Sequence, residues 1–241
     1  MGPGRRGASS TRARKGRGCL WLAWSLQWDV MDADTRARLE DALGLVSSHW
    51  MMNPAERLAI IGLLEVLRPG RALEIGYGYG GFTRVLSRYA AEVHTVDTHE
   101  RVLAISRELP QVTAWHATSD EVLSRFAREG ARFDFCLLDG DHSRAAARRD
   151  LDAAIGIAEV IVMHDAGNPE CRAGYAEALA VHDVYANLDW VDGRIQVDGP
   201  WGGFGLVLTG YPRNQPYRIT PVRTQNFELV AAAWAARPAA G

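Results

Sequence analysis

Cysteine and long apolar runs are both scarce in this sequence. Its 241 residues include three cysteines, Cys19, Cys136 and Cys171, an odd number with no close pairing. This excludes a disulfide framework and a four-cysteine zinc site, and it favours a reducing compartment, so we expect the protein in the cytoplasm. No run approaches 18 consecutive apolar residues, so the sequence predicts no transmembrane helix and no membrane partner.

Lysine is almost absent. Lys15 is the only one, and it lies in a segment rich in Gly and Arg near the N-terminus. A phosphate-binding P-loop needs a lysine after its glycines, and Schiff-base or pyridoxal chemistry needs an amine. Because residues 16–241 contain no lysine, the body of the chain can have neither a P-loop nor Schiff-base or pyridoxal chemistry.

The net charge of −2 conceals an uneven distribution of charge. The first 30 residues hold six basic residues and one acidic residue, whereas residues 31–241 hold 21 basic and 28 acidic residues. The body of the protein thus carries about seven excess negative charges and lacks the basic surface that nucleic-acid binding needs. We expect no nucleic-acid partner.

The composition, 47% hydrophobic and 23% charged, is that of a globular protein. We expect residues 1–30 to be a disordered basic extension and residues 31–210 to form one domain. Residues 211–241 are rich in proline and then helical. They are expected to pack on the domain or to contact a second subunit in a homo-oligomer.

Strands and helices are predicted to alternate through the middle of the chain. Two helices come first, the second beginning at the N-cap pair Asn53-Pro54. Residues 183–191 and 204–210 then predict a strand pair at the sheet edge. The fold class is therefore α/β, with a doubly wound, Rossmann-like, mainly parallel seven-stranded sheet and an antiparallel C-terminal strand pair. The five parallel strands are predicted in residues 71–75, 92–97, 112–118, 133–139 and 159–165, and the helices between and after them in 82–89, 101–109, 121–130, 144–154 and 175–181.

A glycine motif follows the first of these strands. Residues 74–81, EIGYGYGG, fit both E-x-G-x-G-x-G and the dinucleotide pattern G-x-G-x-x-G. The glycines permit a tight turn and close approach of the backbone to a ligand. Asp97 ends the next strand, 21 residues after Gly76, where a carboxylate can accept hydrogen bonds from both ribose hydroxyls. These features fit either S-adenosylmethionine or a nicotinamide dinucleotide.

The acid Glu74, the two preceding helices and the antiparallel pair resemble a class I S-adenosylmethionine-dependent methyltransferase. The resemblance implies that Glu74 helps to place the methionine end of the cofactor, that Asp97 holds the ribose, and that Ser119 or Asp120 borders the adenine. The implied cofactor-binding residues are Glu74, Gly76, Tyr77, Gly78, Gly80, Asp97, Ser119, Asp120 and Asp139.

A second, narrower resemblance covers the next two strand ends. The segment from Asp139 to His142, together with His164-Asp165, is similar to the macrocin-type, family 24 small-molecule O-methyltransferases. Because Asp139 and Asp165 end neighbouring strands, their carboxylates can converge on one cation. The expected metal ligands are Asp139, His164 and Asp165, for Mg²⁺ or another divalent cation such as Mn²⁺, Fe²⁺ or Zn²⁺. Alternatively, Asp139 caps the following helix and His164 is a buried histidine bonded to backbone.

His142 is the preferred general base, with Asp139 as the second catalytic residue. An imidazole with a pKa near 6.5 can take a hydroxyl proton as the oxygen attacks the sulfonium methyl. Asp141 either orients His142 or faces solvent, and the alternative role of His142 is substrate positioning or helix capping. Aromatic and Met residues can supply a lid or belong to the core: Trp50, Met51, Met52 and Trp201.

The sequence thus predicts an S-adenosylmethionine-dependent methyltransferase that acts on a hydroxyl of a small molecule, a sugar or a natural-product scaffold, with or without a divalent metal. One alternative is an NAD(P)-dependent oxidoreductase. Against this alternative, the chain has no Tyr-x-x-x-Lys pair, because its body contains no lysine. The other alternative is a non-catalytic methyltransferase-like partner subunit.

Overall fold

The computed structural model describes residues 50–191 and 201–209. The expected basic extension, the first expected helix and the C-terminal segment 211–241 lie outside the described residues, so those predictions stay open. Within the described ranges, no helix is both long enough and apolar enough to cross a membrane.

One seven-stranded sheet has the strand order β3-β2-β1-β4-β5-β7-β6. Strands β1 to β5 pair in parallel, and β7 pairs antiparallel with both β5 and β6. The predicted fold class is confirmed, including the antiparallel pair at the sheet edge. The strands are β1 (Arg71–Ile75), β2 (Glu92–Asp97), β3 (Val112–His116), β4 (Phe133–Leu138), β5 (Ala158–Met163), β6 (Ala186–Val191) and β7 (Phe204–Leu208).

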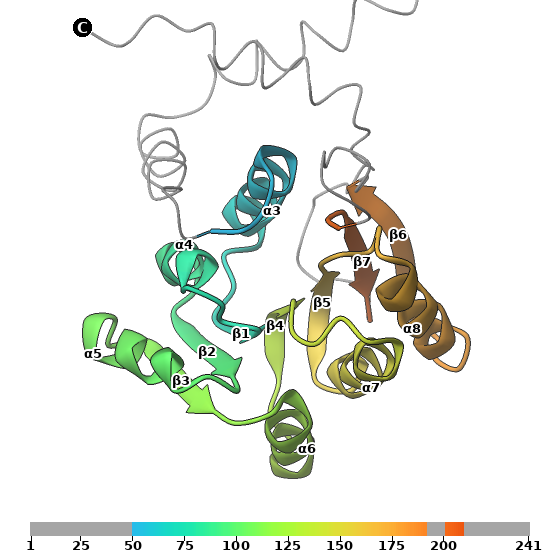
Figure 1. Ribbon diagram of the computed structural model, residues 1–241. Coiled ribbons are helices and arrows are strands. Elements are labelled where there is room, and N and C mark those ends of the chain that lie inside the picture. The colour runs from blue at the N-terminus through green and yellow to red at the C-terminus, as the bar shows by residue number, and fades with distance from the viewer. Residues whose placement is uncertain (1–49, 192–200, 210–241) are drawn as a thin grey trace, which may run out of the picture. The chain divides into compact units, whose positions relative to one another are not determined.

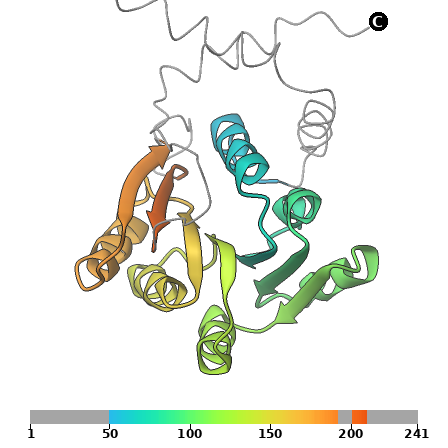
Figure 2. The same ribbon diagram turned by 180° about the vertical axis from the view of Figure 1, so that it is seen from behind.

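Helices cover both faces of the sheet. Figure 1 shows α6, α7 and α8 side by side on one face and α3 and α4 on the other, and Figure 2 shows the same arrangement from behind. This is the doubly wound arrangement that the alternating pattern predicts. The helices are α3 (Pro54–Leu67), α4 (Gly81–Tyr89), the 3₁₀ helix η1 (Glu100–Ala104), α5 (Ile105–Glu108), α6 (Ser119–Glu129), α7 (Arg144–Ile155) and α8 (Pro169–Leu179).

Two predicted helices differ from the structure. The segment 101–109 is a 3₁₀ turn followed by a single α turn rather than one helix. Helix α8 begins six residues before the predicted start at Tyr175, because Asn168 caps it by accepting a hydrogen bond from Glu170 N at 2.9 Å. The Asn-Pro signal that correctly predicted the start of α3 is repeated at Asn168-Pro169 and was overlooked there.

The central strands are buried on both sides, so they read as continuous apolar runs. Leu73, Cys136 and Ile161, on β1, β4 and β5, have no exposed surface. Cys136 is therefore a core residue, and burial raises the pKa of its thiol.

Candidate functional site

The glycine loop after β1 presses against the chain that leaves β4. Gly76 has a left-handed φ of 93°, and a Cβ atom there would overlap the carbonyl oxygen of Asp139. Asp139 N also donates to Ile75 O at 2.9 Å. Glycine adopts this φ without strain and has no Cβ to collide with Asp139, so position 76 requires glycine. The glycine motif and the Asp139 segment are therefore in direct contact.

Glu74 lies beneath this loop. Its Oε2 accepts hydrogen bonds from the hydroxyls of Thr83 at 2.5 Å and Thr95 at 2.7 Å. The side chain thereby joins β1 to α4 and β2. Burial raises the pKa of Glu74 to about 8. These contacts lie inside the protein, so any effect of Glu74 on the methionine end of a cofactor is expected to pass through the loop above it.

Asp97 stands at the end of β2, beside the glycine loop. Its Oδ2 accepts a hydrogen bond from Gly78 N at 3.0 Å, and its Oδ1 accepts one from His99 N at 2.8 Å. This is the position that the ribose prediction requires. Tyr77, another expected cofactor neighbour, is buried, with its ring beneath Gly80, where a Cβ would approach the ring to 2.5 Å.

The two expected adenine neighbours occupy different environments at the start of α6. The Ser119 hydroxyl donates to the buried carboxylate of Asp150 at 2.8 Å. Asp120 is exposed and lies 3.8 Å from the guanidinium of Arg149. We favour Ser119, because its side chain is held in a fixed direction.

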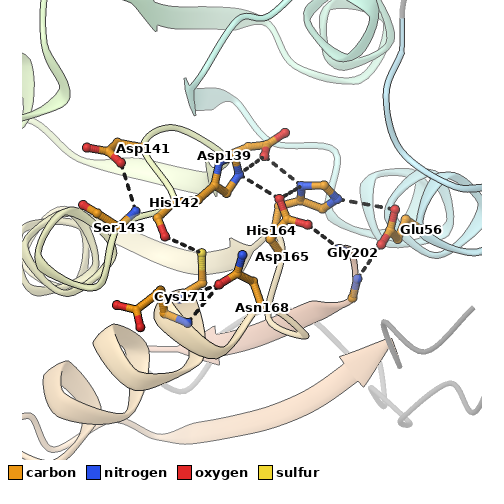
Figure 3. Close-up of polar contacts among 12 residues, drawn as sticks. Glu56, Asp139, Asp141, His142, Ser143, His164, Asp165, Asn168, Cys171 and Gly202 are labelled. Carbon is orange, nitrogen blue, oxygen red and sulfur yellow. Dashed lines mark hydrogen bonds and ion pairs between the residues drawn. The ribbon is translucent and has the colours of Figure 1, made fainter. Parts of the chain in front are cut away.

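Four residues converge after β4 and β5, as Figure 3 shows. His164 Nδ1 lies 2.7 Å from Asp139 Oδ1 and 3.3 Å from Asp165 Oδ2. His142 Nε2 lies 2.7 Å from Asp165 Oδ2 and 3.5 Å from Asp139 Oδ1. One nitrogen or oxygen atom from each side chain lies within 4.8 Å of the other three. We call Asp139, His142, His164 and Asp165 the acid–histidine cluster.

Asp165 is held in this cluster by an unusual backbone conformation. Its φ of 52° is left-handed, which aspartate adopts more readily than most residues but which needs support from its surroundings. Asp165 Oδ1 accepts a hydrogen bond from Gly202 N, and the Tyr175 hydroxyl donates to the carbonyl of His164 at 2.9 Å. The segment 164–165 is thus fixed from both sides.

The two carboxylates and the two imidazoles of the cluster each favour the charged form of the other kind of group. Contacts with Asp139 and Asp165 raise the pKa of His142 to about 9. Burial alone would favour neutral His164, but the charge and hydrogen bond of Asp139, together with the contacts of Asp165 and Glu56, outweigh burial and raise the pKa of His164 well above 6.5. Burial would likewise raise the pKa values of both carboxyls, and the two imidazoles hold them below the usual range instead. The pKa of His142 in this cluster therefore lies above the ordinary imidazole value of 6.5.

Asp141 does not orient His142. Its Oδ1 accepts a hydrogen bond from Ser143 N at 2.9 Å, and its side chain points away from the cluster in Figure 3. Asp165 makes the contact with His142 instead. Ser143 is the N-cap of α7, because its Oγ accepts a hydrogen bond from Ala146 N at 3.3 Å. Neither Asp139 nor His142 therefore caps this helix, so the helix-capping alternatives for these two residues are wrong, and substrate positioning by His142 stays a prediction.

Glu56 is a residue of this site that the sequence analysis missed. Its side chain is completely buried, with Oε2 3.4 Å from His164 Nε2 and Oε1 accepting from Gly203 N at 2.5 Å. Glu56 Oε2 also accepts from Asn53 N at 2.8 Å, and Asn53 Oδ1 accepts from Glu56 N at 3.1 Å, which makes a capping box. The Asn-x-x-Glu spacing was the available signal, but it indicates only a helix start.

The donor set of the cluster fits a divalent cation. Nε2 of His142 and Nδ1 of His164 are the ring nitrogens that face the two carboxylates, and Nε2 of His142 is buried with no hydrogen-bond partner of ordinary geometry among the described residues. Two such nitrogens with two carboxylates suit a transition metal better than Mg²⁺, which prefers oxygen ligands.

Comparison with known proteins identifies the fold. Residues 73–166 match a family model described as a methyltransferase domain. An O-methyltransferase from Bacillus cereus in complex with S-adenosylhomocysteine is 19% identical, with 78% of this chain and 98% of that chain covered and a TM-score of 0.52. An rRNA methylase from Streptococcus thermophilus is 11% identical, with 67% and 100% covered and a TM-score of 0.51. No curated protein matches the sequence.

These structural likenesses concern the fold, and they span enzymes with different acceptors. The segment that matches the family model contains the glycine loop, Asp97 and the whole acid–histidine cluster. The strand order ending 5-7-6 also differs from the 3-2-1-4-5-6 order of the dinucleotide-binding fold, which disfavours the oxidoreductase alternative. Residues 73–166 thus match a methyltransferase domain, and the chain has the fold of the solved methyltransferases.

Proposed function

We propose that this chain is an S-adenosylmethionine-dependent methyltransferase that transfers the methyl group to a hydroxyl oxygen of a small molecule. The observation that carries the proposal is the contact between Gly76 and Asp139, which joins the cofactor loop to the acid–histidine cluster. Methyl transfer requires the nucleophile, the methyl carbon and the sulfur to lie in line at short range. A hydroxyl held at the cluster would be close to a cofactor held on the loop.

The cofactor contacts follow from the same arrangement. Asp97 would accept the ribose hydroxyls, the backbone of the glycine loop would face the methionine portion, and Ser119 would border the adenine. The S-adenosylhomocysteine bound in the Bacillus cereus enzyme, which has a similar fold, supports the choice of cofactor. The acidic body of the chain supports a small-molecule acceptor over a nucleic acid.

His142 would take the hydroxyl proton, with Asp165 holding the imidazole in place at 2.7 Å. A base with a pKa of about 9 is protonated at neutral pH, so it must first lose its proton. A divalent cation would supply the same charge, +2, as the two extra protons that His142 and His164 carry in their charged forms. Held by Asp139, His164 and Asp165, such a cation would polarise the acceptor hydroxyl and lower its pKa.

A labelling experiment tests this proposal. The full-length protein is incubated with S-adenosylmethionine labelled in the methyl group and with phenols, glycosides, amines and carboxylates, in the presence of Mn²⁺ or of a chelator. We expect labelled methyl ethers, fewer of them with the chelator. Label on nitrogen or carboxylate alone would refute transfer to a hydroxyl. Binding of S-adenosylhomocysteine without transfer to any acceptor would favour the non-catalytic alternative.

A further inference from the structure

The segment 201–203 before β7, which we call the Trp201 loop, is fixed by its backbone. Gly202 and Gly203 have left-handed φ values of 89° and 86°. Gly202 N donates to Asp165 Oδ1, and Gly203 N donates to Glu56 Oε1 at 2.5 Å. The carbonyls of the same two glycines accept hydrogen bonds from Gly167 N at 2.9 Å and Ala166 N at 3.2 Å. Two buried carboxylates and the chain after β5 therefore set the path of this loop.

This path places Trp201 next to His142, the candidate general base. The ring centroids of Trp201 and His142 are 5.4 Å apart, with the ring planes at 81°. Trp201 is 42% exposed and the His142 side chain 36% exposed, whereas Trp50 and Met52 are core residues. Trp201 therefore does not belong to the core, and it presents an exposed aromatic surface beside His142.

We propose that Trp201 determines acceptor specificity by forming an apolar wall of the acceptor site, and that the acceptor carries its hydroxyl on a ring with an apolar face. The inference rests on the proposed function, because it assumes that the acceptor hydroxyl meets His142. An indole offers a large, rigid apolar surface at a low entropic cost. A ring lying on it keeps one edge, with its hydroxyl, near the imidazole. Phenols and six-membered sugars both carry a hydroxyl on a ring that has an apolar face.

Glu56 acts in this arrangement as a positioning residue. Its carboxylate is buried and bonded to Gly203 N, and a charged acceptor makes a stronger hydrogen bond to a backbone N–H than a neutral one. Replacing Glu56 weakens one of the bonds that hold the Trp201 loop. The ring of Trp201 is then less firmly held beside His142, and acceptor binding weakens.

The test measures probe binding without turnover. Full-length protein saturated with S-adenosylhomocysteine is titrated by ligand-observed NMR with catechol, with methyl β-D-glucopyranoside and with acyclic 1,2-propanediol. We expect at least one ring probe to bind more tightly than propanediol. Trp201→Ala should weaken that probe roughly thirtyfold, and Trp201→Phe only a few-fold. Whichever ring probe responds identifies the source of the ring, phenol or sugar.

Tyr185→Ala is the matched control, because Tyr185 is an exposed aromatic residue next to Ala186, which pairs with Leu208 at the far end of β7 from the Trp201 loop. It should leave probe binding unchanged. The affinity for S-adenosylhomocysteine, measured in every variant, reports whether each one is folded.

A double variant tests the role of Glu56. If Glu56 acts through Trp201, Glu56→Gln weakens the ring probe in the wild-type background and has no further effect in the Trp201→Ala background. Additive effects would show that Glu56 does not act through this loop.

Equal probe affinity in wild type and Trp201→Ala, or no binding of either ring probe, would overturn the inference. Ring binding that depends on Trp201 without any methyl transfer would leave the inference standing and refute the proposed transfer to a hydroxyl.

Discussion

Glu74 and Asp165 are both buried acids in two neighbouring regions, yet their pKa values are shifted in opposite directions. Glu74 is 1% exposed and receives hydrogen bonds from two threonine hydroxyls, and its pKa rises to about 8. Asp165 is 4% exposed and faces two imidazoles and a backbone N–H, and its pKa falls. Burial alone therefore does not decide the charge. The neighbouring groups decide it.

The difference matches the two tasks that the proposed function gives to this site. The glycine-loop region around Glu74 is neutral in its interior and fixes a backbone shape. The acid–histidine cluster concentrates charge, and under the proposed function it is where the acceptor would lose its proton. Gly76 joins the two regions, because it touches Asp139 directly.

Removing the imidazole from the charged region should have the largest effect. We expect His142→Ala to reduce turnover by roughly 10²- to 10⁴-fold, the usual contribution of a positioned general base, and to leave the affinity for S-adenosylhomocysteine within a few-fold of wild type. Steady-state kinetics and calorimetry measure the two quantities. Asp141→Ala is the matched control, since Asp141 points away from the cluster. Turnover near wild type in His142→Ala would remove this residue as the base.

Gly76→Ala should separate the two regions. The new Cβ would collide with the carbonyl of Asp139 and force a strained φ, at a cost of roughly 3 kcal/mol in the free energy of unfolding. Gly78→Ala is the matched control. Gly78 also has a positive φ, of 55°, but a Cβ there meets no atom within 4 Å, so a smaller loss is expected. Urea unfolding measures both, and equal losses would contradict a close contact at Gly76.

The pH dependence of stability should reveal the neutral acid. The pKa of Glu74 rises from an ordinary 4.5 to about 8 on folding, so between these values the unfolded state releases the proton first. Its contribution to stability must then fall as pH rises, by roughly 3 kcal/mol between pH 5 and pH 8. Glu74→Gln should remove this decline. A decline of the same size in wild type and in Glu74→Gln would show that Glu74 does not cause it.

A divalent cation should stabilise the charged region selectively. At a Mn²⁺ concentration about 100 times its dissociation constant, the free energy of unfolding should rise by about 2.7 kcal/mol. Asp165→Asn should abolish the increase and Glu74→Gln should preserve it, because only the first change removes a ligand of the cluster. Thermal unfolding with and without Mn²⁺ measures the increase. An equal increase in Asp165→Asn would locate the binding site elsewhere.

Local sequence patterns predicted most of the fold. The alternation of apolar strands with amphipathic helices gave the sheet, and Asn53-Pro54 gave the start of α3. The convergence of Asp139 and Asp165 could also be expected, because the carboxyl ends of neighbouring parallel strands meet at one edge.

What the sequence could not predict depends on contacts between distant segments. Glu56 appears in the sequence as an ordinary helix-capping glutamate, and its contact with Gly203 spans 147 residues. The contact of His142 with Asp165 instead of Asp141 depends on the left-handed backbone of Asp165, which no spacing reveals. The shift in the pKa of His142 follows from that same contact.

The most direct test of the account is a crystal structure of the full-length protein with S-adenosylhomocysteine and Mn²⁺. The account predicts the ribose on Asp97, the sulfur beside the junction of Gly76 and Asp139, and an anomalous manganese peak within the acid–histidine cluster. A nucleotide bound away from Asp97, or a sulfur separated from His142 by too great a distance for an acceptor hydroxyl to bridge, would contradict it.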